Sequence, residues 1–272
     1  GFDASSTIEA LSVLKSSGLV DAFNVADSPR AQGRMSALAT SALIQSRMGM
    51  ETILHLTLRH RNLVALHSEL LGAHALGVRN VFVVMGDLPS TGDYPNATAI
   101  SDIKASGMIG LIKALNRGLD LNGKPIEEAT SFFVGCAFNP NTADLDRELK
   151  VLDRKLKAGA DFILTQPVYT AEVVERAHQR LGGFPTPVIL GILPLRSYRH
   201  AEFLDNEVPG MTIPREVKER MRQAGDKAEE FGIRLCQELL QKVQGQVAGA
   251  YIMPPFGRYD VVLRVLKGVG EL

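Results

Sequence analysis

Seven short runs of apolar and β-branched residues recur along the chain, and each run gives way at a polar or turn residue to a stretch of helical periodicity. The runs occupy residues 22–26, 52–56, 80–85, 131–137, 161–165, 187–193 and 248–253. Strands that are apolar on both faces are typical of a parallel sheet covered by helices. Eight such units would close a (β/α)8 barrel, so we predict an α/β fold of the TIM-barrel class whose first strand is either missing or upstream of residue 1.

The segments between these runs predict the helices. Apolar residues at helical spacing indicate helices over residues 5–16, 31–47, 62–76, 108–116 and 144–158. Ser5 or Ser6 can cap the first of them. A further helix begins at Pro214 and continues to Val243, with a break near Gly225 or Gly232. No linker or low-complexity tract interrupts the pattern, so we expect residues 1–272 to form a single domain.

Composition narrows the class of ligand. The 272 residues carry 30 basic and 30 acidic side chains, so no net field attracts nucleic acid or an anionic membrane. No apolar stretch reaches the roughly 20 residues of a membrane span, and the first residues lack a signal-peptide pattern. The two cysteines form neither a disulfide framework nor a CxxC metal pair. We expect a cytoplasmic protein with a small ligand and no metal.

Polar side chains stand where several of the predicted strands end. His55 ends the second run, Asp87 follows the third, Gln166 follows the fifth, and Tyr198 and His200 come just after the sixth. Taken singly, a histidine here can serve only backbone groups, and the aspartate can serve only to cap a turn. Because loops at the carboxyl ends of barrel strands converge, together these residues favour a binding site.

Some chemistries lack a candidate residue at these ends. No lysine is available for a Schiff base, and the six histidines do not show metal-ligand spacing. The segment after the last run, residues 254–258, lacks a glycine-rich phosphate cradle. A polar but non-nucleophilic set of His, Asp and Gln instead suits recognition of a heteroaromatic ring, with a cofactor carrying the hard chemistry.

Several motifs, in order and spacing, resemble the methylenetetrahydrofolate reductase family along essentially the whole chain. They are His55-Leu56-Thr57, Gly86-Asp87-Leu88-Pro89, Arg154-Lys155 with residues 158–161, Thr165-Gln166 and Gly191-Ile192-Leu193-Pro194. The segments at residues 138–141, 206–210 and 251–260 are most similar to the reductase module that some bacteria fuse to a homocysteine methyltransferase module. The candidate partners are a fused or associated methyltransferase module, which the resemblance implies, and a second copy of the chain in a homo-oligomer.

The resemblance implies an FAD-dependent oxidoreductase. Hydride would pass from NADH or NADPH to flavin N5, and then to methylenetetrahydrofolate to give methyltetrahydrofolate, with both substrates using one site in turn. Asp87 would be catalytic, since a carboxylate stabilises the cationic iminium that forms when the methylene bridge opens. Gln166 would contact the pterin, whose edge needs both a donor and an acceptor. Tyr198, His200 and Arg258 would bind the rest of the folate, although Arg258 could instead pair with Asp260.

The same resemblance implies a set of FAD-binding positions. They are Ala26, His55, Met85, Gly86, Asp87, Ser106, Asn139, Arg154 and Lys155. Three of them also have alternatives without a cofactor role. Arg154 and Lys155 could be solvated charges, and Ser106 could be an ordinary helix cap. Ala26, Met85 and Asn139 replace a threonine, an arginine and a histidine of better-known reductases, which predicts altered flavin affinity or redox potential.

Two other functions fit the same motifs. One is a pterin-binding methyltransferase barrel without flavin, and the other is a non-catalytic barrel subunit. The family's proposed proton donor is a glutamate at the end of the first strand, and none of the 272 residues matches it. The sequence therefore accounts for binding and hydride transfer better than for protonation.

Overall fold

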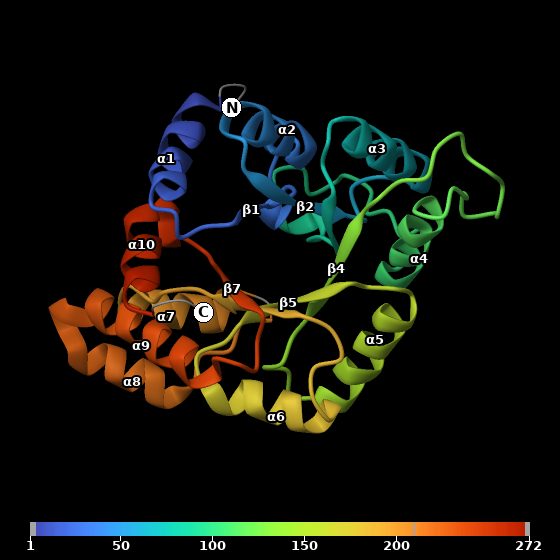
Figure 1. Cartoon of the computed structure of the whole chain (residues 1–272). Coiled ribbons are helices and arrows are strands. Elements are labelled where there is room, and N and C mark those ends of the chain that lie inside the picture. Colours follow the sequence, from blue (N-terminus) through green and yellow to red (C-terminus); the bar gives the residue numbers. More distant parts are fainter. Residues whose placement is uncertain (1–3, 209, 270–272) are drawn as a thin grey trace. The chain divides into compact units, whose positions relative to one another are not determined.

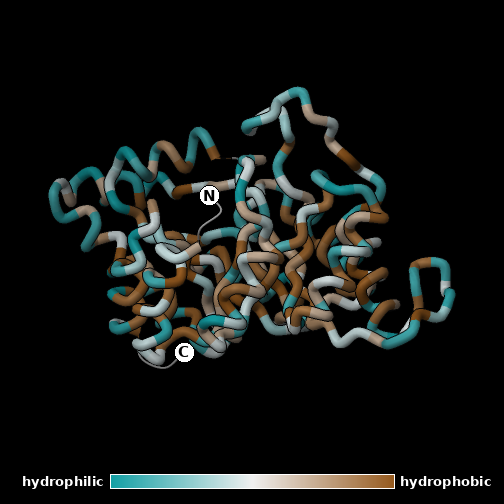
Figure 2. Tube along the Cα trace, turned by 90° about the horizontal axis from the view of Figure 1, so that it is seen from above, coloured by the Kyte–Doolittle hydropathy of each residue, from teal (hydrophilic) through white to brown (hydrophobic). Residues whose placement is uncertain are grey.

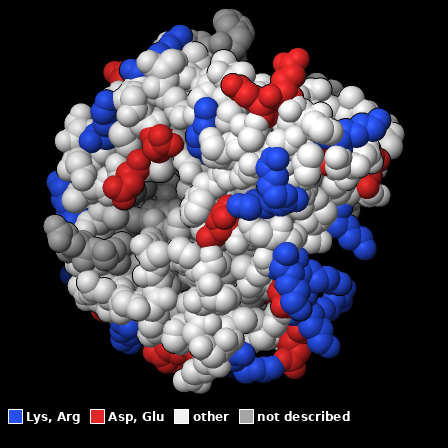
Figure 3. Space-filling view, turned by 45° about the vertical axis from the view of Figure 1, so that its right-hand side comes forward, with Lys and Arg blue, Asp and Glu red and all other residues white. Residues whose placement is uncertain are grey.

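The computed structural model describes residues 4–208 and 210–269, which form two compact units (Figure 1). Within the described residues, unit 1 comprises residues 4–137 and 151–162, and unit 2 comprises residues 138–150, 163–208 and 210–269. Hydrophobic residues run through the interior of the trace, and hydrophilic residues lie mainly on outer helices and loops (Figure 2). Figure 3 shows basic and acidic side chains on one face of the molecule, with the largest group of basic side chains at the lower right.

Unit 1 is built on parallel strands in chain order. Its strands are β1 (Ala22–Val25), β2 (Glu51–Thr57), β3 (Asn80–Val84) and all but the last residue of β4 (Phe133–Phe138). The register places His55 beside Phe82, and Phe82 beside Gly135. The strands are buried through residues such as Leu54, Val81 and Val134, because helices cover a sheet that is apolar on both faces.

The helices of unit 1 begin and end at residues that suit those positions. They are α1 (Ser5–Ser16), α2 (Ala37–Met48), α3 (Leu63–Ala75) and α4 (Ala105–Leu115). Ser36 caps α2 by accepting a hydrogen bond from Ala39 N, and Asn62 caps α3 in the same way. Gly49, with φ of 61°, ends α2. Ser5 lies inside α1, whose capping position is Ala4, so the predicted serine cap is wrong.

The helix predicted over residues 31–47 begins only at Ala37. Ser28, Arg30 and Ala31 have φ values of 46°, 60° and 51°, which no right-handed helix accommodates. A short 3-10 turn, η1 (Pro29–Ala31), occupies this segment and packs against a second one, η2 (Pro89–Thr91). Local spacing predicted a helix here, but contact between these two loops determines the backbone instead.

Unit 2 repeats the alternation of strand and helix. Its strands are β5 (Phe162–Pro167, without Phe162), β6 (Val188–Ile192) and β7 (Gly249–Ile252), again parallel and in chain order. Its helices are α6 (Ala171–Leu181), α7 (Tyr198–Glu207), α8 (Arg215–Ala224), α9 (Ala228–Val243) and α10 (Tyr259–Lys267), and α5 (Leu145–Lys157) contributes residues to each unit.

The core of unit 2 has two parts. In one, α9 and α10 pack on β6 through residues that include Ile192, Leu240 and Val265. In the other, α7, α8 and α9 pack together through residues that include Ala201 and Met221. The predicted break lies between α8 and α9 at Gly225, which has φ of 52°. Gly232, the other predicted position, lies inside α9 and does not interrupt it.

The predicted class of fold is confirmed. Each predicted strand is found within two residues of its bounds, and strands and helices alternate in chain order, so the fold is α/β of the TIM-barrel type. The described residues supply seven strands. The prediction of a first strand that is missing or upstream of residue 1 concerns a segment outside these residues. Within residues 4–208 and 210–269, no helix has the length and apolarity needed to cross a membrane.

Candidate functional site

Asp87 lies in unit 1, directly after β3 and a glycine turn. Gly86 has φ of 82°, and a Cβ at this position would lie 2.9 Å from Thr57 Cβ, so a side chain would clash with the end of β2. The Asp87 side chain is exposed, and its Oδ2 accepts a hydrogen bond of 2.7 Å from Arg30 N. The turn therefore presents a carboxylate at the carboxyl end of the strands, oriented by a backbone donor from the loop after β1.

The loop after β2 holds the backbone around Asp87. Leu58 N and Arg59 N donate to the carbonyl oxygens of Val84 and Met85, extending the strand pairing beyond β2. Arg59 Nη1 donates to Gly86 O at 3.0 Å. His60 Nε2 lies 3.1 Å from Asp87 O and donates to it, since a carbonyl oxygen only accepts. The position of Asp87 is thus determined by contacts from two neighbouring loops.

A buried carboxylate that the sequence analysis missed lies below these loops. Asp27 is 5% exposed, and its Oδ2 accepts from Thr57 N at 3.0 Å, Thr57 Oγ1 at 2.5 Å and Arg61 Nη2 at 2.7 Å. Burial of an ionised group is favourable only with partners of this kind. An acidic residue placed directly after an apolar strand was the signal available in the sequence.

His55 lies within β2 rather than at its end. Its ring packs edge-on against Phe82 with centroids 4.8 Å apart, and its Nε2 lies 3.1 Å from Asn24 Oδ1. Burial lowers the pKa of His55 to about 4, although the charge of Asp27 acts in the opposite direction. The imidazole is therefore neutral near pH 7, and its Nε2 donates to the asparagine oxygen.

We expect a proton titration of His55 to show a midpoint near pH 4, instead of the ordinary value of 6.5. Because the unfolded chain binds the proton more readily, His55 adds to the free energy of unfolding above about pH 6.5 and loses that contribution as pH falls toward 4. NMR of ring-labelled histidines measures the midpoint directly, and Asn24→Ala tests the contribution of the hydrogen bond. A midpoint near 6.5 in the wild-type protein would contradict this assignment.

The remaining predicted cofactor positions of unit 1 differ in exposure. Ala26 is exposed directly after β1, and Met85 is partly buried. Lys155 is 9% exposed and donates to Ala137 O at 2.6 Å, so it is not the solvated charge that the alternative described. Its neighbour Arg154 is exposed.

Ser106 is the second residue of α4 and not its cap. The capping position is Lys104, which makes no side-chain cap, and the first turn of α4 contains no acidic residue. Backbone N–H groups at such a helix start, together with a serine hydroxyl, are donors of the kind that bind phosphate. The start of α4 and the buried ammonium of Lys155 are therefore chemically suited to the phosphates of a dinucleotide cofactor.

In unit 2, Gln166 lies within β5 rather than after it, and its side chain is exposed. The adjacent Thr165 is held on both sides, because its Oγ1 accepts from Gly191 N at 2.8 Å and its carbonyl accepts from the Tyr251 hydroxyl at 2.9 Å. A Cβ on Gly191 would lie 2.6 Å from Thr165 O, so only glycine permits this approach. These contacts fix the strand that presents the Gln166 amide.

Asn139 is engaged within its own unit. Its backbone N–H donates to Glu148 Oε1 at 3.1 Å, its Nδ2 donates to Gly210 O at 3.2 Å, and its Oδ1 accepts from Asn141 N at 3.1 Å. These bonds give the side chain a role in shaping the loop after β4. If the Asn139 amide also contacts a cofactor, it must do so in addition to these hydrogen bonds.

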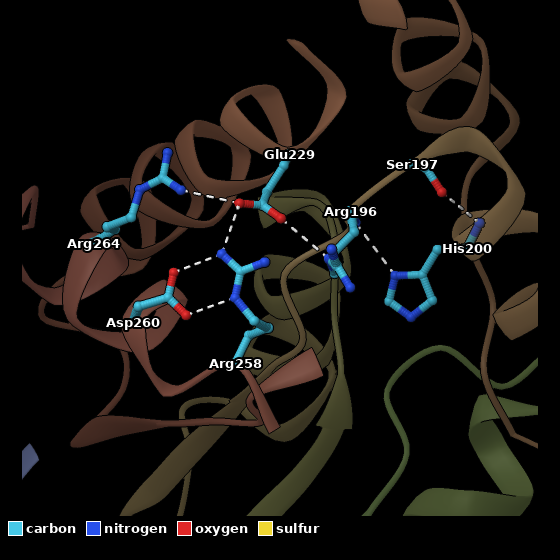
Figure 4. Close-up of polar contacts among 7 residues, drawn as sticks. All are labelled: Arg196, Ser197, His200, Glu229, Arg258, Asp260 and Arg264. Atoms are coloured by element: carbon cyan, nitrogen blue, oxygen red, sulfur yellow. Dashed lines mark hydrogen bonds and ion pairs between the residues drawn. The ribbon is translucent and has the colours of Figure 1, made fainter. Parts of the chain in front are cut away.

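Tyr198 and His200 occupy the first turn of α7. Ser197 caps this helix by accepting a hydrogen bond from His200 N (Figure 4). His200 is 9% exposed, its Nδ1 accepts from Arg196 N at 3.3 Å, and its ring lies 5.1 Å from that of Phe256. Burial, and then the charge of Arg196, lower the pKa of His200. The Tyr198 hydroxyl donates to Glu202 at 2.6 Å. The helix start therefore fixes both side chains.

Arg258 is paired with Asp260, as one alternative predicted (Figure 4). Its Nε and Nη2 each lie 2.7 Å from an oxygen of Asp260, and Nη2 lies 3.5 Å from Glu229. Glu229 also accepts from Arg196 and Arg264, each at 3.1 Å. A carboxylate ligand would therefore share or displace partners that Arg258 already has.

The predicted site residues thus belong to two sets, one in each unit. In unit 1, Asp87 and Gly86 contact the loops after β1 and β2, while His55 lies within β2. In unit 2, the region from Arg196 to His200 contacts Phe256 and, through Glu229, Arg258. Among residues 4–208 and 210–269 no group of three His, Cys, Asp or Glu side chains could hold a metal ion.

Comparison with known proteins gives a consistent result. The family described as methylenetetrahydrofolate reductase matches residues 5–254. The chain is 29% identical to methylenetetrahydrofolate reductase 2 of Saccharomyces cerevisiae over 227 residues, which are 78% of this chain and 35% of that protein. It is 25% identical to the probable methylenetetrahydrofolate reductase (NADPH) of Caenorhabditis elegans over 246 residues, 86% of this chain and 34% of that protein. The chain spans about a third of the length of these relatives.

A solved structure shares the fold. An uncharacterised protein from Clostridium thermocellum, described as binding two copies of 5-methyl-5,6,7,8-tetrahydrofolic acid, has a TM-score of 0.54 at 13% sequence identity. The match covers 98% of this chain and 86% of the other. At this identity the likeness concerns the fold alone.

Proposed function

The chain belongs to the methylenetetrahydrofolate reductase family, and on that premise we propose that it reduces 5,10-methylenetetrahydrofolate to 5-methyltetrahydrofolate. The reductant in this proposal is NADH or NADPH, the bound cofactor is FAD, and one reductase domain carries the reaction. The observation that carries the proposal is the Asp87 carboxylate, exposed at a strand end and oriented by Arg30 N at 2.7 Å.

Asp87 is suited to the charge that develops during this reaction. Opening the methylene bridge of the folate produces a cationic iminium, which a fixed carboxylate stabilises before hydride arrives. Arg59 holds the carbonyl oxygen of Gly86 and His60 holds that of Asp87, so little reorganisation of this turn is needed at that moment. The carboxylate therefore lowers the activation barrier of the folate step more than that of the nicotinamide step.

The residues of unit 1 fit an FAD cofactor. The start of α4 with Ser106 would hold a phosphate, and Lys155, with Arg154 next to it in sequence, would add positive charge. The neutral ring of His55 would offer its free nitrogen, and Ala26, Met85 and Gly86 would contact the cofactor through apolar or backbone atoms. Bound FAD would supply a group that accepts hydride from one substrate and donates it to the other.

The residues of unit 2 are suited to folate. The exposed Gln166 amide offers a donor and an acceptor to a pterin edge. Tyr198, His200 and Arg258 would contact the remainder of the substrate. Since Arg258 is bound to Asp260 and Glu229, we propose that it acts through a shared network rather than as an independent cation.

Absorption spectra test the cofactor and both half-reactions. Purified protein, or protein incubated with FAD, should show bands near about 370 and 450 nm. Addition of NADH or NADPH without oxygen should bleach the longer-wavelength band, and methylenetetrahydrofolate should then restore it. Colourless protein that does not take up FAD would reject the flavin reductase and favour a pterin-binding methyltransferase or a non-catalytic subunit. Protein that is bleached but does not recover would reject folate as the substrate.

A further inference from the structure

We propose that Asp27 is the positioning residue for Asp87. This inference rests on the proposed function, because Asp27 affects the reaction only through the position of the Asp87 carboxylate. Asp27 is not itself available to a substrate, since its side chain is only 2% exposed and is surrounded by its protein partners. The contacts that lead from Asp27 to Asp87 all lie within unit 1.

The first connection runs through the end of β2. Asp27 accepts hydrogen bonds from both the backbone N–H and the hydroxyl of Thr57, which fixes the rotamer of that side chain. Thr57 Cβ and Cγ2 in turn lie 2.9 and 3.0 Å from the place that a Cβ of Gly86 would occupy. The Gly86 turn therefore rests on a threonine whose orientation Asp27 determines.

The second connection runs through the loop that follows β2. Arg61 donates through Nη2 to Asp27 at 2.7 Å and through Nη1 to Thr57 O at 3.2 Å. These bonds bracket Arg59 and His60, which bind Gly86 O and Asp87 O. Because the charged pair is largely buried, its geometry is maintained more strongly than that of a surface pair. Asp27 thereby fixes residues 57–61, the segment whose side chains hydrogen-bond to the backbone of Gly86 and Asp87.

The third connection is the turn that begins directly after Asp27. Ser28, Arg30 and Ala31 all have positive φ, a backbone region that is costly for residues other than glycine. This turn directs Arg30 N toward Asp87 Oδ2 at 2.7 Å. On its far side it is held by Asp93, whose N–H donates to Ala31 O and whose carboxylate accepts from Gly33 N. With Asp27 fixing its near side, the strained turn holds one orientation of its donor.

Asp27 therefore joins the loops after β1 and β2, and each of these loops binds Asp87. Loss of its charge should leave the two loops with their other contacts but relax the geometry between them. A displacement on the order of 1 Å at a catalytic group can cost about a hundredfold in rate. The effect expected of Asp27 is therefore specific to the environment of Asp87.

NMR of the full chain tests this inference without reference to activity. The response measured is the change in the chemical shift of the Arg30 amide proton that Asp87→Asn causes, because this substitution removes the charge that Arg30 N faces. Asp27→Asn should reduce the response by more than half. The matched control is Asp161→Asn, because Asp161 also accepts from a backbone N–H, that of Val134, and from a cation, Lys113, but lies directly before β5. An unchanged Arg30 response in Asp27→Asn would overturn the inference.

Kinetics with FAD-loaded protein give the second arm. Asp27→Asn should slow the folate half-reaction by roughly 10- to 100-fold, leave the nicotinamide half-reaction within about twofold, and cause no further loss in an Asp87→Asn background. Equal loss in both half-reactions, or additive losses in the double variant, would overturn the inference. If Asp27→Asn does not fold, Thr57→Val replaces it in both arms, because it removes the hydroxyl but keeps the bulk against Gly86.

The two proposals fail in different ways. A wild-type protein without folate reduction rejects the proposed function, while the Arg30 response still decides whether Asp27 positions Asp87. A wild-type protein that reduces folate but shows the same Arg30 response with and without the Asp27 charge retains the proposed function and rejects the positioning role.

Discussion

Asp87→Asn should slow the reduction of methylenetetrahydrofolate by about 100- to 1000-fold, while FAD affinity and bleaching by NAD(P)H change little. Asparagine has the size of aspartate, and its oxygen can still accept from Arg30 N, so the turn should persist. What is lost is the negative charge facing the iminium. Stopped-flow absorbance of the pre-reduced enzyme, mixed with the folate, measures the affected step in isolation.

Asp102→Asn is the matched control for this variant. Asp102 is also an exposed aspartate on the long loop after β3, and its Oδ2 accepts from the backbone N–H of Leu63 at 3.0 Å. We expect this variant to reduce folate within a few-fold of the wild-type rate, because no role in charge stabilisation is assigned to it. Equal losses of FAD binding and folate reduction in Asp87→Asn would instead show that Asp87 supports the structure of the loop.

Gly232→Ala should destabilise the protein by about 2 to 4 kcal/mol. Helix propensity alone predicts the opposite, because alanine favours a helix more than glycine does. A Cβ at this position in α9 would lie 2.0 Å from Leu195 O and 2.9 Å from Leu195 C. Both are backbone atoms, so the clash cannot be relieved by rotating a side chain. We expect a lowering of the melting temperature by roughly 4 to 7 °C in a thermal unfolding experiment.

Gly110→Ala provides the opposite expectation within another helix. Gly110 lies inside α4, and no atom lies within 4 Å of the place its Cβ would occupy. Alanine at this position should raise the free energy of unfolding by about 0.5 to 1 kcal/mol, because it restricts the unfolded chain and favours the helix. If both variants changed stability in the same direction, close packing at Leu195 would not be the cause.

Elements whose cause is local could be predicted well from the sequence. The runs at residues 80–85 and 187–193 correspond to β3 and β6, because a strand buried on both faces needs an uninterrupted apolar segment. Gly225 ends α8 with positive φ, which glycine adopts readily. Asp87 and Gln166 were predicted as site residues because a polar residue near the end of an apolar strand is itself a local signal.

Properties that depend on distant partners could not be predicted in the same way. Lys155 lies in a strongly charged segment, yet it is buried because Ala137 O accepts from its ammonium. The segment at residues 31–36 has helical spacing, yet its loop packs against η2 and α2 starts only at Ala37. Arg258 was assigned to the folate, and only the tertiary structure shows that Glu229 competes for it from α9.

The sequence by itself determined the order of strands and helices, the class of fold and the family, because periodicity and short motifs are properties of neighbouring residues. The tertiary structure alone decided which polar groups support Asp87. Asp27 and Thr57 are 30 residues apart in sequence, yet they are joined by a hydrogen bond. Gly232 and Leu195 are 37 residues apart, yet a Cβ on Gly232 would clash with the backbone of Leu195. A hydrogen bond or a steric clash depends on distances of a few ångströms, and these arise only when β1 pairs with β2, and α9 packs against the loop after β6.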